Sequence, residues 1–257
     1  MTQSFSSLLF ALSLSVYGGQ RLHPLLSKVG NLVKDVRSDL TDLQLLVLDP
    51  DLKEIYGDLN NENIVIVNEF HKARAFRKVH LEIAFVGSSL QILHCVFFPK
   101  TSFDLPIFGV DLVISTEGVS AAIVDLSPVG NKLPDRFISE LETLRIHKYR
   151  NVRQLPSWGN IFSPYVCFIK PADQKEEDSF FELVNNYLKL LVSIASTTTA
   201  DPPNSSESLE RYKRQSLYCL NQKKNDKTRN LLGQIFDSAW ADRYIEFVLF
   251  DTPPAPC

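Results

Sequence analysis

Four ionisable side chains lie in the middle of otherwise apolar segments of this chain. They are His80 and Glu82 in VHLEIAF, His94 in QILHCVFF and Asp111 in FGVDLVI. Ionisable groups are seldom buried among apolar residues unless they have a partner. If these imidazoles and carboxyls meet in a cleft, their pKa values would be shifted and they would suit proton transfer. The chemistry they predict is protonation rather than nucleophilic attack.

Each of these groups also has a purely structural interpretation. Side chains alternate between the two faces of a strand, so His80 and Glu82 share a face with Lys78, which describes an ordinary half-solvated strand. His94 and Asp111 could pair with each other as a satisfied hydrogen bond in the core. The pattern alone leaves the structural and the catalytic interpretations open.

A second concentration of polar residues is QKKNDKTR at residues 222–229, which precedes an apolar helical pattern. Asn225 or Asp226 could be the N-cap of that helix, with the lysines as ordinary solvated charges. Alternatively, Asp226 faces a cleft while nearby lysines bind anionic groups. Both interpretations remain open at this point.

Common cofactor motifs are missing from the sequence. There is no G-x-G-x-x-G after a strand, no G-x-x-x-x-G-K-[ST], no G-x-S-x-G and no H-E-x-x-H. The four cysteines, Cys95, Cys167, Cys219 and Cys257, form no C-x-x-C pair. This spacing favours reduced thiols over a disulfide framework or a metal site, and it predicts a reducing, cytoplasmic location.

The composition is that of an ordinary globular protein. With 257 residues, 44% hydrophobic and 22% charged, the chain is expected to form a single domain over residues 1–257. A net charge of −3 does not favour nucleic acid or an anionic membrane as a partner. No apolar stretch approaches the roughly twenty residues of a membrane span. The apolar run Leu8–Tyr17 follows no Lys or Arg, so we assign it to a first helix rather than a signal peptide.

The first elements that could position these groups are helical. Apolar residues recur at helical spacing over residues 5–48, which predicts two short helices with breaks at Gly18–Gly19 and at Pro24. From Asn63 to Ser127, β-branched and aromatic runs alternate with turn residues. Because the connections are short, neighbours in sequence should pair in an antiparallel meander. The predicted strands are Ile64–Phe70, Arg74–Phe85, Leu90–Phe98, Pro106–Ser115 and Val119–Leu126.

The remainder of the chain is mainly helical. A helix at about Pro134–Lys148 and a late strand at Tyr165–Lys170 come first. A mobile surface loop is expected at Thr197–Ser206. Strands followed by helices predict an α+β fold, a central antiparallel sheet covered by helices. The helices predicted in the last third are Glu176–Ser196, Ser208–Gln222 and Lys227–Phe247.

The motifs around these groups resemble one known family. In the predicted sheet they are FRKVHLEIA at 76–84, ILHCVFFP at 92–99, LPIFGVDLV at 105–113 and GVSAAIVDLSP at 118–128. LPSWGNIFSPYVCFIKP at 155–171 and QKKNDKTRNLLGQIFDSAWADRYIEFVLFD at 222–251 follow. In combination they resemble the ferredoxin-dependent bilin reductases. The resemblance implies a three-layer α/β/α sandwich, with the bilin held between the sheet and the C-terminal helices.

The same resemblance implies a radical mechanism with no bound flavin, metal or other cofactor. Ferredoxin delivers single electrons to bound biliverdin, and side chains supply the protons. Asp111 and His94 would be the central proton donors, and Glu82 would protonate the exocyclic vinyl group of the D ring. His80 would support the hydrogen-bond network on the same strand face.

Four further residues are implied to bind the substrate. Arg153 and Lys227 match basic positions near the bilin propionates. Asp226 of the NDK motif would lie on the opposite, helical wall of the pocket, and Asn225 of the same motif is placed with it.

The joint presence of Glu82 and His94 implies the phycocyanobilin-forming type, which reduces the D-ring vinyl group and then the A ring. Two alternatives are kept: a relative with another product, such as phycoerythrobilin, and a carrier that binds biliverdin without changing it. The expected partners are biliverdin and ferredoxin, and the protein is expected to be a monomer.

Ferredoxins are small and acidic, so the encounter calls for a basic face whose binding weakens with salt. The candidate residues for that face are Arg74, Arg77, Lys78, Lys223, Lys224 and Arg229.

Overall fold

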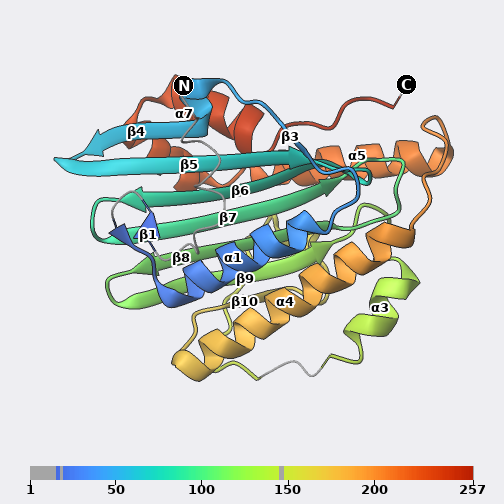
Figure 1. The fold of residues 1–257 in the computed structure, drawn as a ribbon, viewed down its shortest axis with the longest axis horizontal. Helices are drawn as coiled ribbons and strands as arrows, with labels where there is room; N and C mark the ends of the chain where they lie inside the picture. Colours follow the sequence, from blue (N-terminus) through green and yellow to red (C-terminus); the bar gives the residue numbers. More distant parts are fainter. Residues whose placement is uncertain (1–15, 18–19, 145–147, 257) are drawn as a thin grey trace, which may run out of the picture.

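The computed structural model describes residues 16–17, 20–144 and 148–256. Its middle layer is an eight-stranded antiparallel sheet (Figure 1). The strand order is β10-β9-β8-β7-β6-β5-β3, and β4 also pairs with β5. Five consecutive strands form the meander that the sequence predicts. They are β5 (Glu62–Lys72), β6 (Phe76–Val86), β7 (Leu90–Pro99), β8 (Ile107–Ser115) and β9 (Gly118–Ser127).

Three shorter strands complete the sheet. The predicted late strand is confirmed as β10 (Cys167–Ile169), which pairs with β9. The other two, β3 (Gln44–Leu45) and β4 (Glu54–Leu59), both pair with β5 and were not predicted. Within β4 only Ile55 is buried. The segment therefore lacks the alternation of apolar and polar residues from which a half-buried strand is predicted.

One face of the sheet is covered by α1 (Pro24–Ser38), α3 (Asp135–Leu141) and α4 (Gln174–Thr197) (Figure 1). Buried residues of α4 recur at helical spacing, as at Phe180, Val184 and Leu188. The predicted helix Glu176–Ser196 is therefore confirmed. The predicted helix Pro134–Lys148 is shorter than expected, and residues 145–147 lie outside the described part.

The helix boundary predicted at Pro24 is confirmed. Pro24 is the first residue of α1, a position where proline is favoured because no backbone N–H is needed there. Val16–Tyr17 is strand β1, paired with β2 (Gln20–Arg21), rather than the end of a helix. The rest of the predicted first helix, and Gly18–Gly19, lie outside the described residues. A short helix, α2 (Pro50–Lys53), precedes β4.

The other face carries the C-terminal elements, namely α5 (Ser206–Gln222), α6 (Asp226–Ile235), α7 (Ser238–Tyr244) and the π-helical turn η4 (Ile245–Leu249). A single 3-10 turn, η3 (Gly159–Ile161), contacts α5. The helices on both faces give the three layers that the family resemblance implies.

The predicted single helix Lys227–Phe247 is wrong. The backbone leaves helical geometry at Phe236, with φ −111° and ψ −82°. Asp237 then caps α7 by accepting a hydrogen bond of 2.7 Å from the amide of Trp240. An aspartate followed by a turn of helix is a start signal, and here it divides the pattern into two helices.

The loop between α4 and α5 makes defined contacts. Ser205 caps α5 by accepting from the amide of Ser208 at 3.1 Å, and the amide of Asp201 donates to the carbonyl of Ser102 at 2.7 Å. The mobility expected of this loop stays a prediction. Among the helices that the structure describes, none has the length and apolar character needed to cross a membrane.

Alternation along the strands divides the sheet between two cores. On β6, Val79, Leu81 and Ile83 face α1 and α4, whereas His80 and Glu82 lie on the opposite face, which is the division the sequence predicts. The ionisable groups are therefore on the face covered by α5 to η4.

Candidate active site

Strand register places the polar residues in one row across four strands. Asn68 of β5 lies opposite Glu82 of β6, Glu82 opposite His94 of β7, and His94 opposite Asp111 of β8. Directly opposed residues have Cβ atoms about 4.5–5.5 Å apart, so each can reach the next. Together with His80, these residues are called the polar row below. The structure thus brings together His80, Glu82, His94 and Asp111.

His94 and Asp111 form an ion pair at the open end of the polar row. The distance from His94 Nδ1 to Asp111 Oδ1 is 2.6 Å, and the Asp111 side chain is 44% exposed. Burial lowers the pKa of His94, but Asp111 and Glu82 more than offset that effect and leave the pKa above its usual value. Within the described residues, the buried Nε2 of His94 has no hydrogen-bond partner. A protonated His94 therefore has an N–H donor left for a ligand.

Glu82 lies deeper in the same row and contacts Tyr244 at the end of α7. Tyr244 Oη donates to Glu82 Oε2 at 2.6 Å, and both side chains are buried. Burial raises the pKa of Glu82, with His94 and Tyr244 acting against that shift. Glu82 thus retains its proton at a higher pH than an exposed carboxyl, which suits a general acid.

His80 is held as a neutral imidazole. Its Nε2 lies 2.8 Å from Asn68 Oδ1, and Asn68 Nδ2 donates to the carbonyl of Leu52 at 2.8 Å. Because the amide nitrogen is engaged by that carbonyl, Oδ1 faces His80, and the network assigns the proton to Nε2. Burial, followed by His94 and Lys78, lowers the pKa of His80 well below its usual value. Its buried Nδ1 is an acceptor without a partner among the described residues.

Aromatic rings border the polar row. Phe70 stacks on His80 with centroids 4.0 Å apart, and Phe250 meets the edge of His94 at 5.7 Å. Tyr244 stacks on Trp240 at 4.9 Å. The site therefore combines proton-bearing groups with flat apolar surfaces.

Two residues of the polar network, Asn68 and Tyr244, are missing from the sequence prediction. Asn68 sits in the apolar run VIVNEF, the same signal that picks out His94, so it could have been found. Tyr244 lies 162 positions from Glu82, and no local pattern relates the two.

The other four predicted site residues do not hydrogen bond to the polar row within the described ranges. Arg153 lies over the ring of Phe168 at 5.7 Å. Asn225 is the N-cap of α6, its Oδ1 accepting from the amide of Lys227 at 3.3 Å, while Asp226 and Lys227 are exposed. The capping interpretation of Asn225 is confirmed, and contact between these four residues and a substrate stays a prediction.

The prediction that Lys78 meets a protein partner is wrong. Lys78 is only 4% exposed and binds Asp251 together with two backbone carbonyls, and the side chain of Arg77 is 9% exposed and binds Asp251 as well. Burial between the sheet and the C-terminal segment removes both side chains from any docking face. Of the remaining candidates, Lys224 is exposed.

A family model for ferredoxin-dependent bilin reductases matches residues 31–251. The chain belongs to this family. It is 48% identical over 236 residues to a phycocyanobilin:ferredoxin oxidoreductase of Prochlorococcus marinus (strain MIT 9303), covering 92% of this chain and 89% of that protein. A protein of the same name from Synechococcus sp. (strain CC9902) is 48% identical over 237 residues, covering 92% and 96%.

The bilin reductase fold is shared with a solved structure of tomato phytochromobilin synthase in complex with biliverdin. The TM-score is 0.69 at 16% identity, over 86% of this chain and 81% of the tomato chain. At that identity the likeness shows the fold alone. The α+β architecture predicted from the sequence is thereby confirmed.

The cysteines of this bilin reductase are dispersed in the structure. Cys95, Cys167 and Cys219 are free and buried, and Cys257 is outside the described residues. Among the residues described, no three His, Cys, Asp or Glu side chains gather as a metal site requires.

Proposed function

We propose that this bilin reductase uses electrons from reduced ferredoxin to convert biliverdin to phycocyanobilin. The observation that carries the proposal is the register that sets Glu82 beside His94 and His94 beside Asp111 on the sheet face covered by the C-terminal helices. The name shared by the similar proteins of Prochlorococcus and Synechococcus supports the same product. Binding alone would not require three proton-bearing groups in a row.

The bilin would lie between the polar row and the C-terminal helices. His94 Nε2 and His80 Nδ1 have no partner in the part of the chain that the structure describes, and they would supply a donor and an acceptor for the carbonyl and N–H groups of a tetrapyrrole. Phe70 and Phe250 supply flat apolar surfaces for its rings. Arg153 and Lys227 would bind the two propionates, with Asn225 and Asp226 on the helical wall.

Protons would reach the substrate by two routes. Asp111 is partly exposed and can exchange protons with water, passing them to the ring system with His94. Glu82 is buried and its pKa is raised by that burial, so it can hold a proton and give it to the D-ring vinyl group. Each double bond reduced takes two electrons from ferredoxin and two protons, and the A ring follows the vinyl group, for four electrons in all.

The test is anaerobic turnover of biliverdin with reduced ferredoxin, followed by absorbance and by chromatography of the extracted bilins. Phycocyanobilin is the expected product. Another reduced bilin would overturn the product assignment and the role given to Glu82. Tight binding of biliverdin that is recovered unchanged would identify a carrier and contradict the proposal.

A further inference from the structure

Tyr244 contacts the buried end of the polar row from outside the sheet. Its Oη lies 2.6 Å from Glu82 Oε2 and 3.0 Å from Asn68 Oδ1. A phenol has one proton, so it can donate to only one of these oxygens at a time. When Glu82 is protonated, the phenol can accept from the carboxyl and donate to Asn68. When Glu82 is ionised, the phenol can donate to the carboxylate instead.

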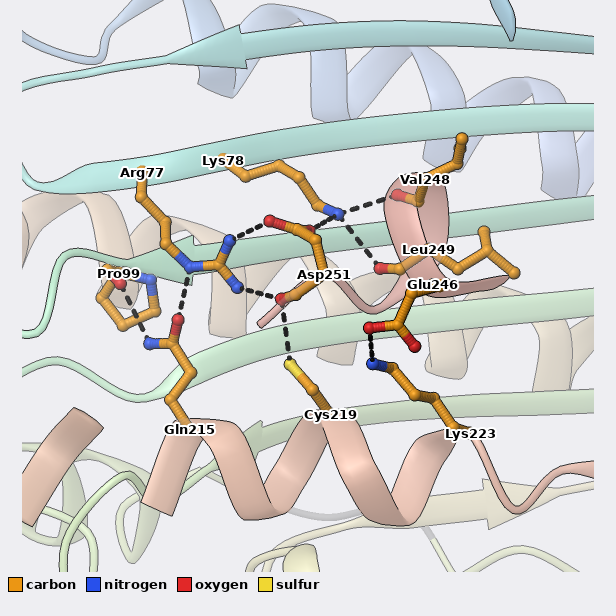
Figure 2. A network of polar contacts seen from close by, with 10 residues as sticks. All are labelled: Arg77, Lys78, Pro99, Gln215, Cys219, Lys223, Glu246, Val248, Leu249 and Asp251. Carbon is orange, nitrogen blue, oxygen red and sulfur yellow. Dashed lines mark hydrogen bonds and ion pairs between the residues drawn. The ribbon is translucent and has the colours of Figure 1, made fainter. Parts of the chain in front are cut away.

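Tyr244 is held by the segment that it begins, residues 244–251, called the C-terminal strap here. After Tyr244 the strap continues with the π-helical turn η4, closed by a hydrogen bond of 3.0 Å from the amide of Phe250 to the carbonyl of Ile245. Such turns are rare and are frequent at functional sites. Lys78 Nζ donates to the carbonyls of Val248 at 2.8 Å and Leu249 at 3.1 Å (Figure 2). Strand β6 thereby binds carbonyl groups that a helix end leaves unpaired.

Asp251 ties the end of the strap to the same strand. Its carboxylate pairs with Lys78 and, at 2.5 Å, with Arg77, whose Nη2 also donates to the Asp251 carbonyl at 2.9 Å (Figure 2). Arg77 Nε donates to Gln215 of α5 at 2.5 Å. The set of Arg77, Lys78 and Asp251 is called the latch. The latch binds the end of the strap to β6 at positions that lie a few residues before Glu82 in the sequence.

We propose that Tyr244 is a positioning residue for Glu82 and that the latch holds the Tyr244 hydroxyl in place. This inference rests on the proposed function, in which Glu82 gives a proton to the D-ring vinyl group. As the proton leaves, the O–H bond of Glu82 breaks, a C–H bond forms on the bilin, and ferredoxin supplies the electrons. The phenol then donates its hydrogen bond to the new carboxylate and stabilises it. Tyr244 thereby determines how readily Glu82 releases its proton, and so which double bond is reduced first.

Glu82 also faces ionisable groups that the loss of the phenol does not remove. Burial raises the pKa of Glu82 most, His94 of β7 lowers it, and Asp111 of β8 raises it. His80 and Lys78 lie on the same face of Glu82's own strand. Because Tyr244 also lowers the pKa of Glu82, loss of the phenol alone should raise that pKa.

Tyr244→Phe is the decisive variant, since it keeps the ring that stacks on Trp240 and deletes only the hydroxyl. Tyr187→Phe is its matched control, because Tyr187 of α4 is also buried but lies in the core on the other face of the sheet, where it donates to the carbonyl of Tyr165 at 2.7 Å. The protonated carboxyl band of Glu82 is followed by infrared difference spectroscopy against pH and assigned by its loss in Glu82→Gln. We expect the midpoint to rise by about one pH unit in Tyr244→Phe and to stay unchanged in Tyr187→Phe.

The product mixture is the second readout. In Tyr244→Phe, vinyl reduction should slow by about tenfold while A-ring reduction continues, so an intermediate with the D-ring vinyl group intact accumulates. Asp251→Asn should act in the same direction by loosening the latch. Its control is Glu246→Gln, which removes an ion pair of 2.6 Å with Lys223 on the exposed side of the same strap (Figure 2).

An infrared midpoint for Glu82 that is the same in Tyr244→Phe and the unmodified protein would overturn the inference. That titration does not depend on turnover, so the result separates the two proposals. If the unmodified protein leaves biliverdin unchanged, the proposed function fails. If it makes phycocyanobilin and Tyr244→Phe shifts neither the midpoint nor the intermediate, only the role of Tyr244 fails.

Discussion

The two faces of strands β6 and β7 differ sharply although they share one backbone. Toward α1 and α4 the central side chains of both strands are apolar and buried, as at Leu81 and Leu93. Toward the C-terminal helices the adjacent positions carry Glu82 and His94, which form a continuous polar row with Asp111. Period-two alternation lets a single strand contribute to the core and to the site at neighbouring positions.

Because of this difference, substitutions one residue apart should affect either the stability of the protein or its catalysis, but not both. Removing an apolar side chain leaves a cavity whose cost falls on folding. Removing a proton donor at a partly open site costs catalysis instead. Substitutions on the apolar face should therefore lower the free energy of unfolding, and substitutions on the polar face should lower the turnover rate.

The largest effect is expected on the polar face, from His94→Gln. Glutamine keeps hydrogen-bonding capacity but cannot carry the proton, so turnover of biliverdin should fall by about 10²–10⁴-fold. Biliverdin binding and the thermal unfolding midpoint should change little. Stopped-flow absorbance under anaerobic conditions measures the turnover of biliverdin. Differential scanning calorimetry measures the thermal unfolding midpoint. Full turnover in this variant would remove His94 from the proposed proton path.

On the apolar face, Leu93→Ala alters the residue next to His94. Leu93 is fully buried, so the truncation should lower the free energy of unfolding by about 2–5 kcal/mol. Chemical denaturation measures the loss. The fraction that remains folded should reduce biliverdin at the unmodified rate, because the side chain points away from the row. A loss of turnover much greater than the loss of folded protein would contradict the conclusion that the apolar face affects stability and not catalysis.

Glu82→Gln should change how stability depends on pH. The pKa of Glu82 is raised in the folded protein, so the folded state binds this proton more tightly than the unfolded state. The stabilising contribution of the carboxyl is present below its unfolded pKa, about 4.5, and is lost as the pH rises through the folded value. Denaturation curves at a series of pH values should show this decline in the unmodified protein and a flatter profile in Glu82→Gln. Parallel profiles would contradict the burial argument.

Tyr187→Phe should give the smallest effect. Removing the hydroxyl that donates to Tyr165 should cost about 0.5–1.5 kcal/mol of stability, because a backbone acceptor is left without its donor. The product and its rate of formation should not change, which is checked by chromatography after a fixed number of turnovers. An altered product would mean that the apolar face influences the chemistry directly.

Much of the sheet could be predicted from local patterns. Short turns between β-branched runs determine the meander, and alternation assigns His80 and Glu82 to one face and Leu81 to the other. Because hairpin partners lie close in sequence, the approach of His94 to Asp111 is also accessible to local reasoning. These features depend on interactions between neighbouring segments, which is why they could be read from the sequence.

The remaining features depend on contacts between distant segments. Lys78 looks like a solvated lysine until residues 248–251 fold over it, and Tyr244 meets Glu82 only when α7 packs on the sheet. The division of the last helix at Phe236 and Asp237 is set by a local cap, yet the surrounding apolar pattern continues through it. Local sequence patterns do not show which residues of such distant segments come into contact.

In the proposed mechanism the polar row supplies the protons and ferredoxin supplies the electrons. Asp111→Asn tests it most directly, because this substitution removes a proton donor and leaves the sheet and the electron donor intact. Reduced ferredoxin is added anaerobically to the variant bound to biliverdin, and electron paramagnetic resonance is recorded alongside absorbance. We expect a persistent bilin radical and no phycocyanobilin. Phycocyanobilin formed at the unmodified rate, without a persistent radical, would contradict it.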